Sequence, residues 1–209
     1  MFVVSTVIQF TLQKMVVDYT ALTPRAVPRK GTDMKYELRP LTLADADKLY
    51  EFYQTIPASE NGAANKAFGL TKPQFIEWIK QKEKSARGLD VRDDRVAATT
   101  YVLYVDDVPV GRSNLRHYLN AALEQDGGHI GLSVAPQYRG RGYSKILLHE
   151  TLKRAKEKGI NPVLVFHFAD NIPACKMSES VGGKLMEERF QEKRGRLIRK
   201  YAFDTSLLD

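Results

Sequence analysis

The sequence predicts an α/β (α+β) domain in which a mixed, mostly antiparallel sheet of about seven strands is flanked by about four helices. Predicted strands and helices follow one another in the order β-α-α-β-β-β-α-β-α-β-β, without an internal repeat, which is typical of a sheet covered by helices. One strand–helix–strand unit, over residues 129–168, is long enough for a parallel crossover. With 209 residues, 43% of them hydrophobic, the chain can bury one sizeable core, so we expect one domain.

The first half of the domain is expected to hold one strand and two helices. The strand alternates well enough for a sheet edge and ends at Pro40. Thr71 is a suitable N-cap for the second helix, and Pro73 fits the first turn of that helix. In order, we predict a strand over 35–41, a helix over 43–53, a loop over 57–70, a helix over 71–82 and a charged connection over 83–95.

The second half is expected to alternate strands with two helices. Asp106 and Asp107 separate two apolar strands and predict a tight hairpin turn. Gly159 ends the first helix of this half, and Gly182 ends the second. The predicted elements are strands over 99–105, 108–119 and 129–135, a helix over 145–158, a strand over 162–168, a helix over 172–181, and strands over 184–191 and 196–203.

The composition restricts the partners and the compartment. A net charge of +7 favours anionic partners, and it suits nucleic acid, an anionic membrane surface or a polyphosphate cofactor equally well. Because Cys175 is the single cysteine, an internal disulfide framework is excluded, and the chain is compatible with a reducing cytoplasm, where we expect it to reside. Four histidines and one cysteine offer no pair at ligand spacing, so we expect no metal site.

The first 33 residues differ in character from the rest. Gln9 and Gln13 interrupt an apolar stretch that falls well short of the roughly 20 residues a membrane span requires, so we expect no membrane partner. No basic segment precedes that stretch, as a signal peptide would require. We expect residues 1–33 to be a leader or linker that is poorly ordered or non-native, with an extra strand or helix packed on the domain as the alternative. Residues 34–205 are expected to form the functional domain.

A glycine-rich turn at the start of a long helix is the most informative feature of the chain. Gly140 and Gly142 leave backbone N–H groups at the helix start without intrahelical partners, and these groups attract phosphate. Arg139 and Arg141 lie at the positive end of the helix dipole, a conflict that a bound anion would relieve. The alternative is that the glycines serve only close packing. A P-loop pattern is absent, and the dinucleotide fingerprint is matched only in part.

Over residues 35–203 the chain resembles the GNAT superfamily of acetyl-coenzyme A-dependent N-acetyltransferases. The most specific resemblance is Gln137-x-x-Gly140-x-Gly142, which matches the superfamily's Q/R-x-x-G-x-G/A pyrophosphate signature after a strand and before a long helix. Asn171, followed by a short helix and Gly182-Gly183, is similar to the second superfamily motif. The resemblance implies a GNAT-like sheet and an N-acetyltransferase domain over 34–205.

This resemblance implies acetyl-CoA as cosubstrate and an acyltransferase that moves the acetyl group directly to a primary amine of a small molecule or protein. A backbone N–H near the middle of the strand over 129–135 would then stabilise the developing oxyanion. Asn171 would orient the pantetheine arm or the incoming amine. The implied cofactor-binding residues are Leu132, Ser133, Val134, Arg139, Gly140, Arg141, Gly142, Tyr143, Ser144 and Asn171.

The catalytic groups depart from the superfamily pattern. Many members carry a tyrosine as general acid where this chain has Ser178, and a serine hydroxyl is a much weaker acid than a phenol. We keep Ser178 as a candidate general acid that acts through a bridging water. The alternative is that it is a helix residue without a catalytic role. For the general base we rank His129 first and His167 second, beside the alternative that both are structural.

Two other classes of function are kept as alternatives. The missing tyrosine motivates an acyl-CoA-binding regulatory or sensor protein of the same fold without turnover. The Arg-Gly-Arg-Gly run over 139–142 motivates nucleic-acid binding, but it is a single copy in an ordered turn, whereas RNA-binding segments of this kind are repeated and disordered. We therefore expect no nucleic-acid partner. A homodimer is left open because many relatives dimerise.

Overall fold

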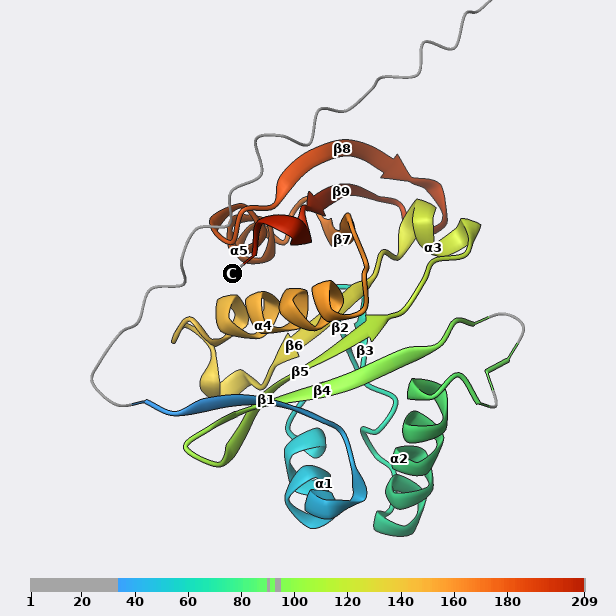
Figure 1. Ribbon diagram of the computed structural model, residues 1–209, viewed down its shortest axis with the longest axis vertical. Coiled ribbons are helices and arrows are strands. Elements are labelled where there is room, and N and C mark those ends of the chain that lie inside the picture. The colour runs from blue at the N-terminus through green and yellow to red at the C-terminus, as the bar shows by residue number, and fades with distance from the viewer. Residues whose placement is uncertain (1–33, 90, 93–94, 209) are drawn as a thin grey trace, which may run out of the picture.

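A computed structural model describes residues 34–89, 91–92 and 95–208 of the protein (Figure 1). The predicted leader, residues 1–33, lies outside the described residues. Within the described part of the chain, no helix is both long enough and apolar enough to cross a membrane.

The larger sheet has four strands in the order β1-β4-β5-β6, and every neighbouring pair is antiparallel. The turn between β4 and β5 is the hairpin that the sequence predicts. Asp106 and Asp107 have φ values of 48° and 62°, and a two-residue hairpin turn with positive φ at both positions matches the twist of its strands. The strands are β1 (Tyr36–Pro40), β4 (Ala98–Val105), β5 (Val108–Arg116) and β6 (Ile130–Val134).

Helices cover both faces of this sheet, with α1 (Ala46–Gln54) and α2 (Lys72–Ala86) on one face and α4 (Tyr143–Glu157) on the other (Figure 1). A short 3₁₀ helix, η1 (Leu43–Asp45), leads into α1. Helix α2 begins at a capping box, because Thr71 and Gln74 satisfy each other's free backbone groups. The core on the α1 and α2 side contains Leu49, Tyr53, Phe75, Ile79, Val102 and Tyr104, and the core on the α4 side contains Leu103, Leu115, Leu147, Leu148 and Leu152.

The smaller sheet has three antiparallel strands in the order β7-β9-β8. Tyr201 and Phe203 of β9 are buried and join the core beneath α4. The elements are β7 (Val163–Phe168), α5 (Ile172–Ser180), β8 (Lys184–Gln191) and β9 (Arg196–Phe203), with 3₁₀ helices η3 (Glu192–Arg194) and η4 (Thr205–Leu207).

The two sheets meet at one corner and are not paired along β6 and β7. The His129 N–H donates to the Leu164 carbonyl at 2.7 Å, the only backbone hydrogen bond between these two segments in the described chain. In return, the Leu164 N–H donates to Nδ1 of His129 at 3.0 Å. A Cβ on Gly128 would lie 2.4 Å from the Leu164 carbonyl oxygen, so only glycine permits this approach. The predicted fold class is confirmed, but its sheet is split into four and three strands.

A short hairpin and a short helix lie outside the strands and helices that we predicted. A hairpin of two-residue strands, β2 (Ser59–Glu60) and β3 (Ala63–Ala64), occupies the predicted loop over 57–70. The predicted strand over 108–119 ends at Arg116, and the short helix α3 (Ala121–Asp126) follows. Asn120 starts α3, because its side-chain oxygen accepts the Leu123 N–H at 3.0 Å.

Candidate active site

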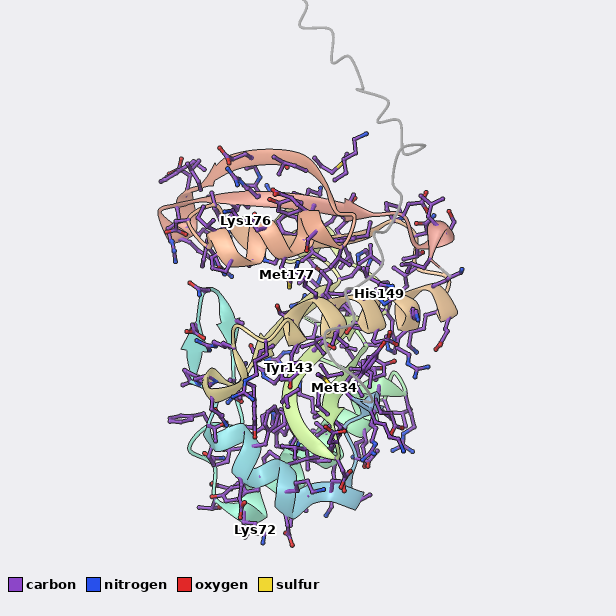
Figure 2. The ribbon with its side chains drawn as sticks, turned by 90° about the vertical axis from the view of Figure 1, so that its left-hand side faces the viewer. Met34, Lys72, Tyr143, His149, Lys176 and Met177 are labelled. Atoms are coloured by element: carbon purple, nitrogen blue, oxygen red, sulfur yellow. The ribbon has the colours of Figure 1, made fainter. Side chains whose placement is uncertain are left out.

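A cavity of about 730 Å³ lies between the separated edges of the two sheets. Its walls come from β5, β6 and β7, from α2, from the starts of α4 and α5, and from the β2–β3 hairpin. Figure 2 labels Tyr143 at the start of α4 and Met177 on α5, two residues that line the cavity from different elements. The tip of the hairpin reaches the smaller sheet, since a Cβ on Gly62 would lie 3.1 Å from the Phe168 ring.

The predicted glycine turn lines the cavity and presents free N–H groups. After the 3₁₀ helix η2 (Pro136–Tyr138), Gly140 and Gly142 have φ values of 76° and 83°. In the described chain, the N–H groups of residues 140–144 have no hydrogen-bond acceptor. A Cβ on either glycine would meet no atom within 4 Å, so the backbone conformation and not close packing requires glycine here. The helix dipole and these N–H groups together form an anion site.

The two arginines of the turn have different surroundings. Arg139 lines the cavity, but its Nη1 donates to Glu60 of the hairpin at 3.0 Å and its Nε donates to the Val134 carbonyl at 3.1 Å. Arg141 is exposed, with its guanidinium 5.9 Å from the centre of the Tyr138 ring. Part of the positive charge that the sequence places at the turn is therefore used to hold the β2–β3 hairpin.

Strand β6 leaves one edge of its backbone open to the cavity. The Arg116 N–H donates to the His129 carbonyl, and the Ala135 N–H donates to the Val110 carbonyl. Because the backbone groups of an antiparallel strand alternate in direction, the N–H and carbonyl of Ser133 also point towards β5. Leu132 and Val134 then point their N–H and carbonyl groups towards the opposite edge. All three predicted residues line the cavity, but only Leu132 and Val134 offer it backbone groups.

Asn171 lines the cavity at the start of α5. It occupies the N-cap position, yet its side chain makes no capping hydrogen bond. The amide is therefore available to a ligand, which is compatible with the orienting role that the sequence predicts.

Ser178 and His167 form a hydrogen-bonded pair that joins α5 to β7. The Ser178 Oγ lies 2.7 Å from Nε2 of His167. Ser178 is fully buried and absent from the cavity wall, whereas His167 lines the cavity. Burial lowers the pKa of His167 to about 4, so its ring is neutral at pH 7.

His129 lies at the corner where the two sheets meet and is not among the cavity-lining residues. Because its Nδ1 accepts the Leu164 N–H, its proton is on Nε2 when the ring is neutral. Burial, followed by the charge of Arg116, lowers the pKa of His129 to about 4. The role of general base stays a prediction for this residue.

A cationic wall on the α2 side of the cavity was missed in the sequence. It consists of Lys82 from α2 together with Arg112 and Arg116 from β5, and all three line the cavity. The alternation of Arg112, Asn114 and Arg116 along a strand whose intervening residues are buried could have placed the two arginines on one face of β5, but not beside Lys82 of α2.

The comparisons with known proteins identify the family. The sequence model of the acetyltransferase (GNAT) family matches residues 65–182, more than half of the chain. The chain belongs to this family. Membership confirms the predicted resemblance and the predicted enzyme class, an acyltransferase that uses acetyl-CoA as cosubstrate.

Individual relatives are distant or partial. The mycothiol acetyltransferase of Corynebacterium aurimucosum is 42% identical over 57 residues, which is 27% of this chain and about a fifth (19%) of that protein's length. The structure of RimL, a ribosomal L7/L12 alpha-N-protein acetyltransferase in complex with coenzyme A, has a TM-score of 0.64 at 13% identity and covers 87% of this chain and 98% of its own. The ribosomal-protein-S5-alanine acetyltransferase of Vibrio fischeri has a TM-score of 0.61 at 14% identity, with coverages of 83% and 95%. Structural similarity at 13% and 14% sequence identity shows only that the fold is shared.

Proposed function

We propose that residues 34–205 form an N-acetyltransferase domain that transfers the acetyl group of acetyl-CoA directly to a primary amine of a small molecule or protein. The observation that carries this proposal is the row of unbonded N–H groups over residues 140–144, beside a cavity flanked by the open edge of β6. Backbone donors that are already in place are suited to a pyrophosphate, because binding requires little rearrangement.

The cosubstrate would be held by three sets of groups. The N–H groups of residues 140–144 bind the pyrophosphate, and Arg141 adds positive charge from the surface. The backbone groups of Leu132 and the N–H of Val134 pair with the amides of the pantetheine arm, since the Val134 carbonyl already accepts a hydrogen bond from Nε of Arg139. Asn171 orients the arm or the amine from the other wall. Bound in this way, acetyl-CoA supplies an activated thioester to the amine.

The open edge of β6 also offers a group for catalysis. A thioester carbonyl develops negative charge when an amine attacks it, and a fixed backbone N–H in a site shielded from water stabilises that charge. We assign this role to the free N–H groups of Leu132 and Val134. Ser178 as acid and His129 as base stay predictions, and His167 links Ser178 to the cavity through the 2.7 Å contact.

Calorimetric titration of the full chain with acetyl-CoA tests the cosubstrate site, and release of free thiol upon addition of primary amines tests turnover. Saturable binding with amine-dependent thiol release is the expected result. Undetectable binding at high micromolar acetyl-CoA would refute the proposal.

The alternative function is a regulatory or sensor protein that binds acyl-CoA without turnover. The observation that favours it is the absence of Ser178 from the cavity wall, together with the low pKa of both candidate histidines. Tight acetyl-CoA binding without thiol release across a broad amine panel would support this alternative. A cytoplasmic location and a homodimer remain predictions.

A further inference from the structure

The cationic wall faces the side of the sheet opposite to α4. Ser113 of β5 points towards α4, since its Oγ lies 2.7 Å from Thr151 Oγ1. Side chains alternate between the two faces of a strand, and Arg112 and Arg116 are one and three residues from Ser113. They therefore point to the other face, where α1 and α2 pack. In agreement, the Arg112 guanidinium lies 5.8 Å from the centre of the Tyr53 ring of α1. The wall thus lines a part of the cavity that the body of α4 does not cover.

The three cations of the wall have no carboxylate partner among the described residues. Arg112 donates one hydrogen bond, to the Ala64 carbonyl at 2.8 Å, and its buried Nε has no partner. Arg116 donates to the Gly127 and Gly128 carbonyls at 3.2 and 2.8 Å. The Nζ of Lys82 lies 5.5 Å from the centre of the Trp78 ring. Carbonyl and ring contacts orient these groups but leave their charges unneutralised.

The carboxylates of the described cavity wall are already used. Only Glu60 and Asp126 are found there, and they form ion pairs with Arg139 and Arg189. Burial, followed by the charges of the neighbouring cations Arg95, Arg112, Lys66 and Arg116, lowers the pKa of Lys82 to about 8. A partly buried group of like charges is costly without a counter-ion, so the wall is built to receive an anion.

The cosubstrate does not supply that anion at this place. Its phosphates are assigned to the glycine turn, and the pantetheine arm and the thioester that enter the cavity carry no charge. We propose that the acceptor amine also bears an anionic group, a carboxylate or a phosphate, which Lys82, Arg112 and Arg116 bind. This inference rests on the proposed acetyl transfer. It places polyamines outside the substrate class, because their charges would be repelled by the wall.

Matched acceptors test the inference by turnover. Amino acids are compared with their amides, phosphoethanolamine with ethanolamine, and spermidine serves as the polycation, with thiol release as the readout. We expect the best anionic acceptor to have at least a tenfold higher kcat/KM than its neutral counterpart, and the two pairs distinguish a carboxylate from a phosphate. Equal or better turnover of the neutral amines or of spermidine overturns the inference, even where acetyl transfer itself is established.

Trp78 gives a second readout that does not depend on turnover. It is the only tryptophan of the chain and lines the cavity beside Lys82. Titration with inorganic phosphate and with acetate, without acetyl-CoA, should change its fluorescence in a saturable and salt-sensitive manner for at least one of the two anions. Unchanged fluorescence with both overturns the inference. Failure of acetyl-CoA to bind in calorimetry would instead remove the proposed function.

Variants of Lys82 test whether the cationic wall binds the acceptor or the cosubstrate. Lys82→Met should lower the preference for the anionic acceptor about tenfold and raise its KM, with the Kd of acetyl-CoA unchanged, and Lys82→Arg should retain the preference. Lys80→Met is the matched control, because Lys80 is exposed on the same helix and pairs with Glu77. If Lys82→Met weakens acetyl-CoA and leaves the acceptor preference intact, the wall belongs to the cosubstrate and the inference is wrong.

Discussion

Replacing Lys82 by methionine should stabilise the free protein at pH 7. The pKa of this lysine falls from 10.5 to about 8, mainly through burial. A shift of that size corresponds to about 3 kcal/mol of unfavourable free energy at pH 7, where the lysine is charged in both the folded and the unfolded chain. Since part of the side chain is exposed, screening by solvent reduces the expected gain to about 2 kcal/mol. Methionine keeps an apolar contact with Trp78.

The stabilisation depends on pH in a defined direction. Below pH 8 the folded and the unfolded lysine are both protonated, so the wild type carries the full penalty. As the pH rises from about 8 to 10.5, the folded lysine loses its proton first and the penalty disappears. The gap in unfolding free energy between Lys82→Met and the wild type should therefore be largest near pH 7 and shrink towards pH 10.5.

Urea unfolding followed by circular dichroism at pH 7 and pH 10 measures this gap. Circular dichroism is preferred because the change lies beside the only tryptophan. Lys80→Met, on the exposed face of the same helix, should stay within about 0.5 kcal/mol of the wild type at both pH values. A Lys82→Met variant that is no more stable than the wild type at pH 7, or whose advantage is the same at pH 10, would refute the reasoning.

Three further predictions concern the corner, the histidines and the glycine turn. Gly128→Ala should lower the free energy of unfolding, measured in urea, by about 3 kcal/mol or more. The new Cβ would lie 2.4 Å from the Leu164 carbonyl oxygen, and the φ of Gly128 is 63°. Gly131→Ala is the control, because a Cβ at that position meets no atom within 4 Å. His129 and His167 each have a pKa of about 4 in the folded chain, against 6.5 in the unfolded chain. Because the unfolded chain binds protons first, the free energy of unfolding should fall as the pH drops from about 6.5 to 4. A wild-type stability that does not change over this range would contradict the burial of the two histidines as neutral rings. Gly142→Ala should raise the Kd of acetyl-CoA at least tenfold in calorimetry and lower the free energy of unfolding by about 1 kcal/mol. Alanine disfavours the φ of 83° that the turn requires, but its Cβ meets no neighbouring atom. An unchanged Kd would show that the turn is not part of the cosubstrate site.

Local signals made much of the fold predictable. The capping box of Thr71 and Gln74, the two aspartates between β4 and β5, and the glycine turn before α4 are each contained in a few consecutive residues. The family followed from the glycine turn and from Asn171. The β2–β3 hairpin could also have been found, because Asn61-Gly62 is a strong two-residue turn signal within a segment that we predicted as a loop.

The arrangement of the site was not predictable, because it depends on contacts between residues that lie far apart in the sequence. The separation of β6 from β7 depends on the contact of Gly128 and His129 with Leu164. The Ser178 contact with His167 joins a helix to a strand, and the cationic wall joins α2 to β5. None of these pairs follows from spacing or periodicity, since each requires the packing of complete elements.

The split between β6 and β7 leaves the sheet with an unfinished hydrogen-bond ladder in its middle. A ligand whose amides pair with Leu132 and Val134 takes the position of a missing strand, so its binding free energy adds to the free energy of unfolding. At a ligand concentration of 100 times Kd, this addition is about 2.7 kcal/mol. The resistance of the protein to unfolding would then rise and fall with the cellular supply of its cosubstrate.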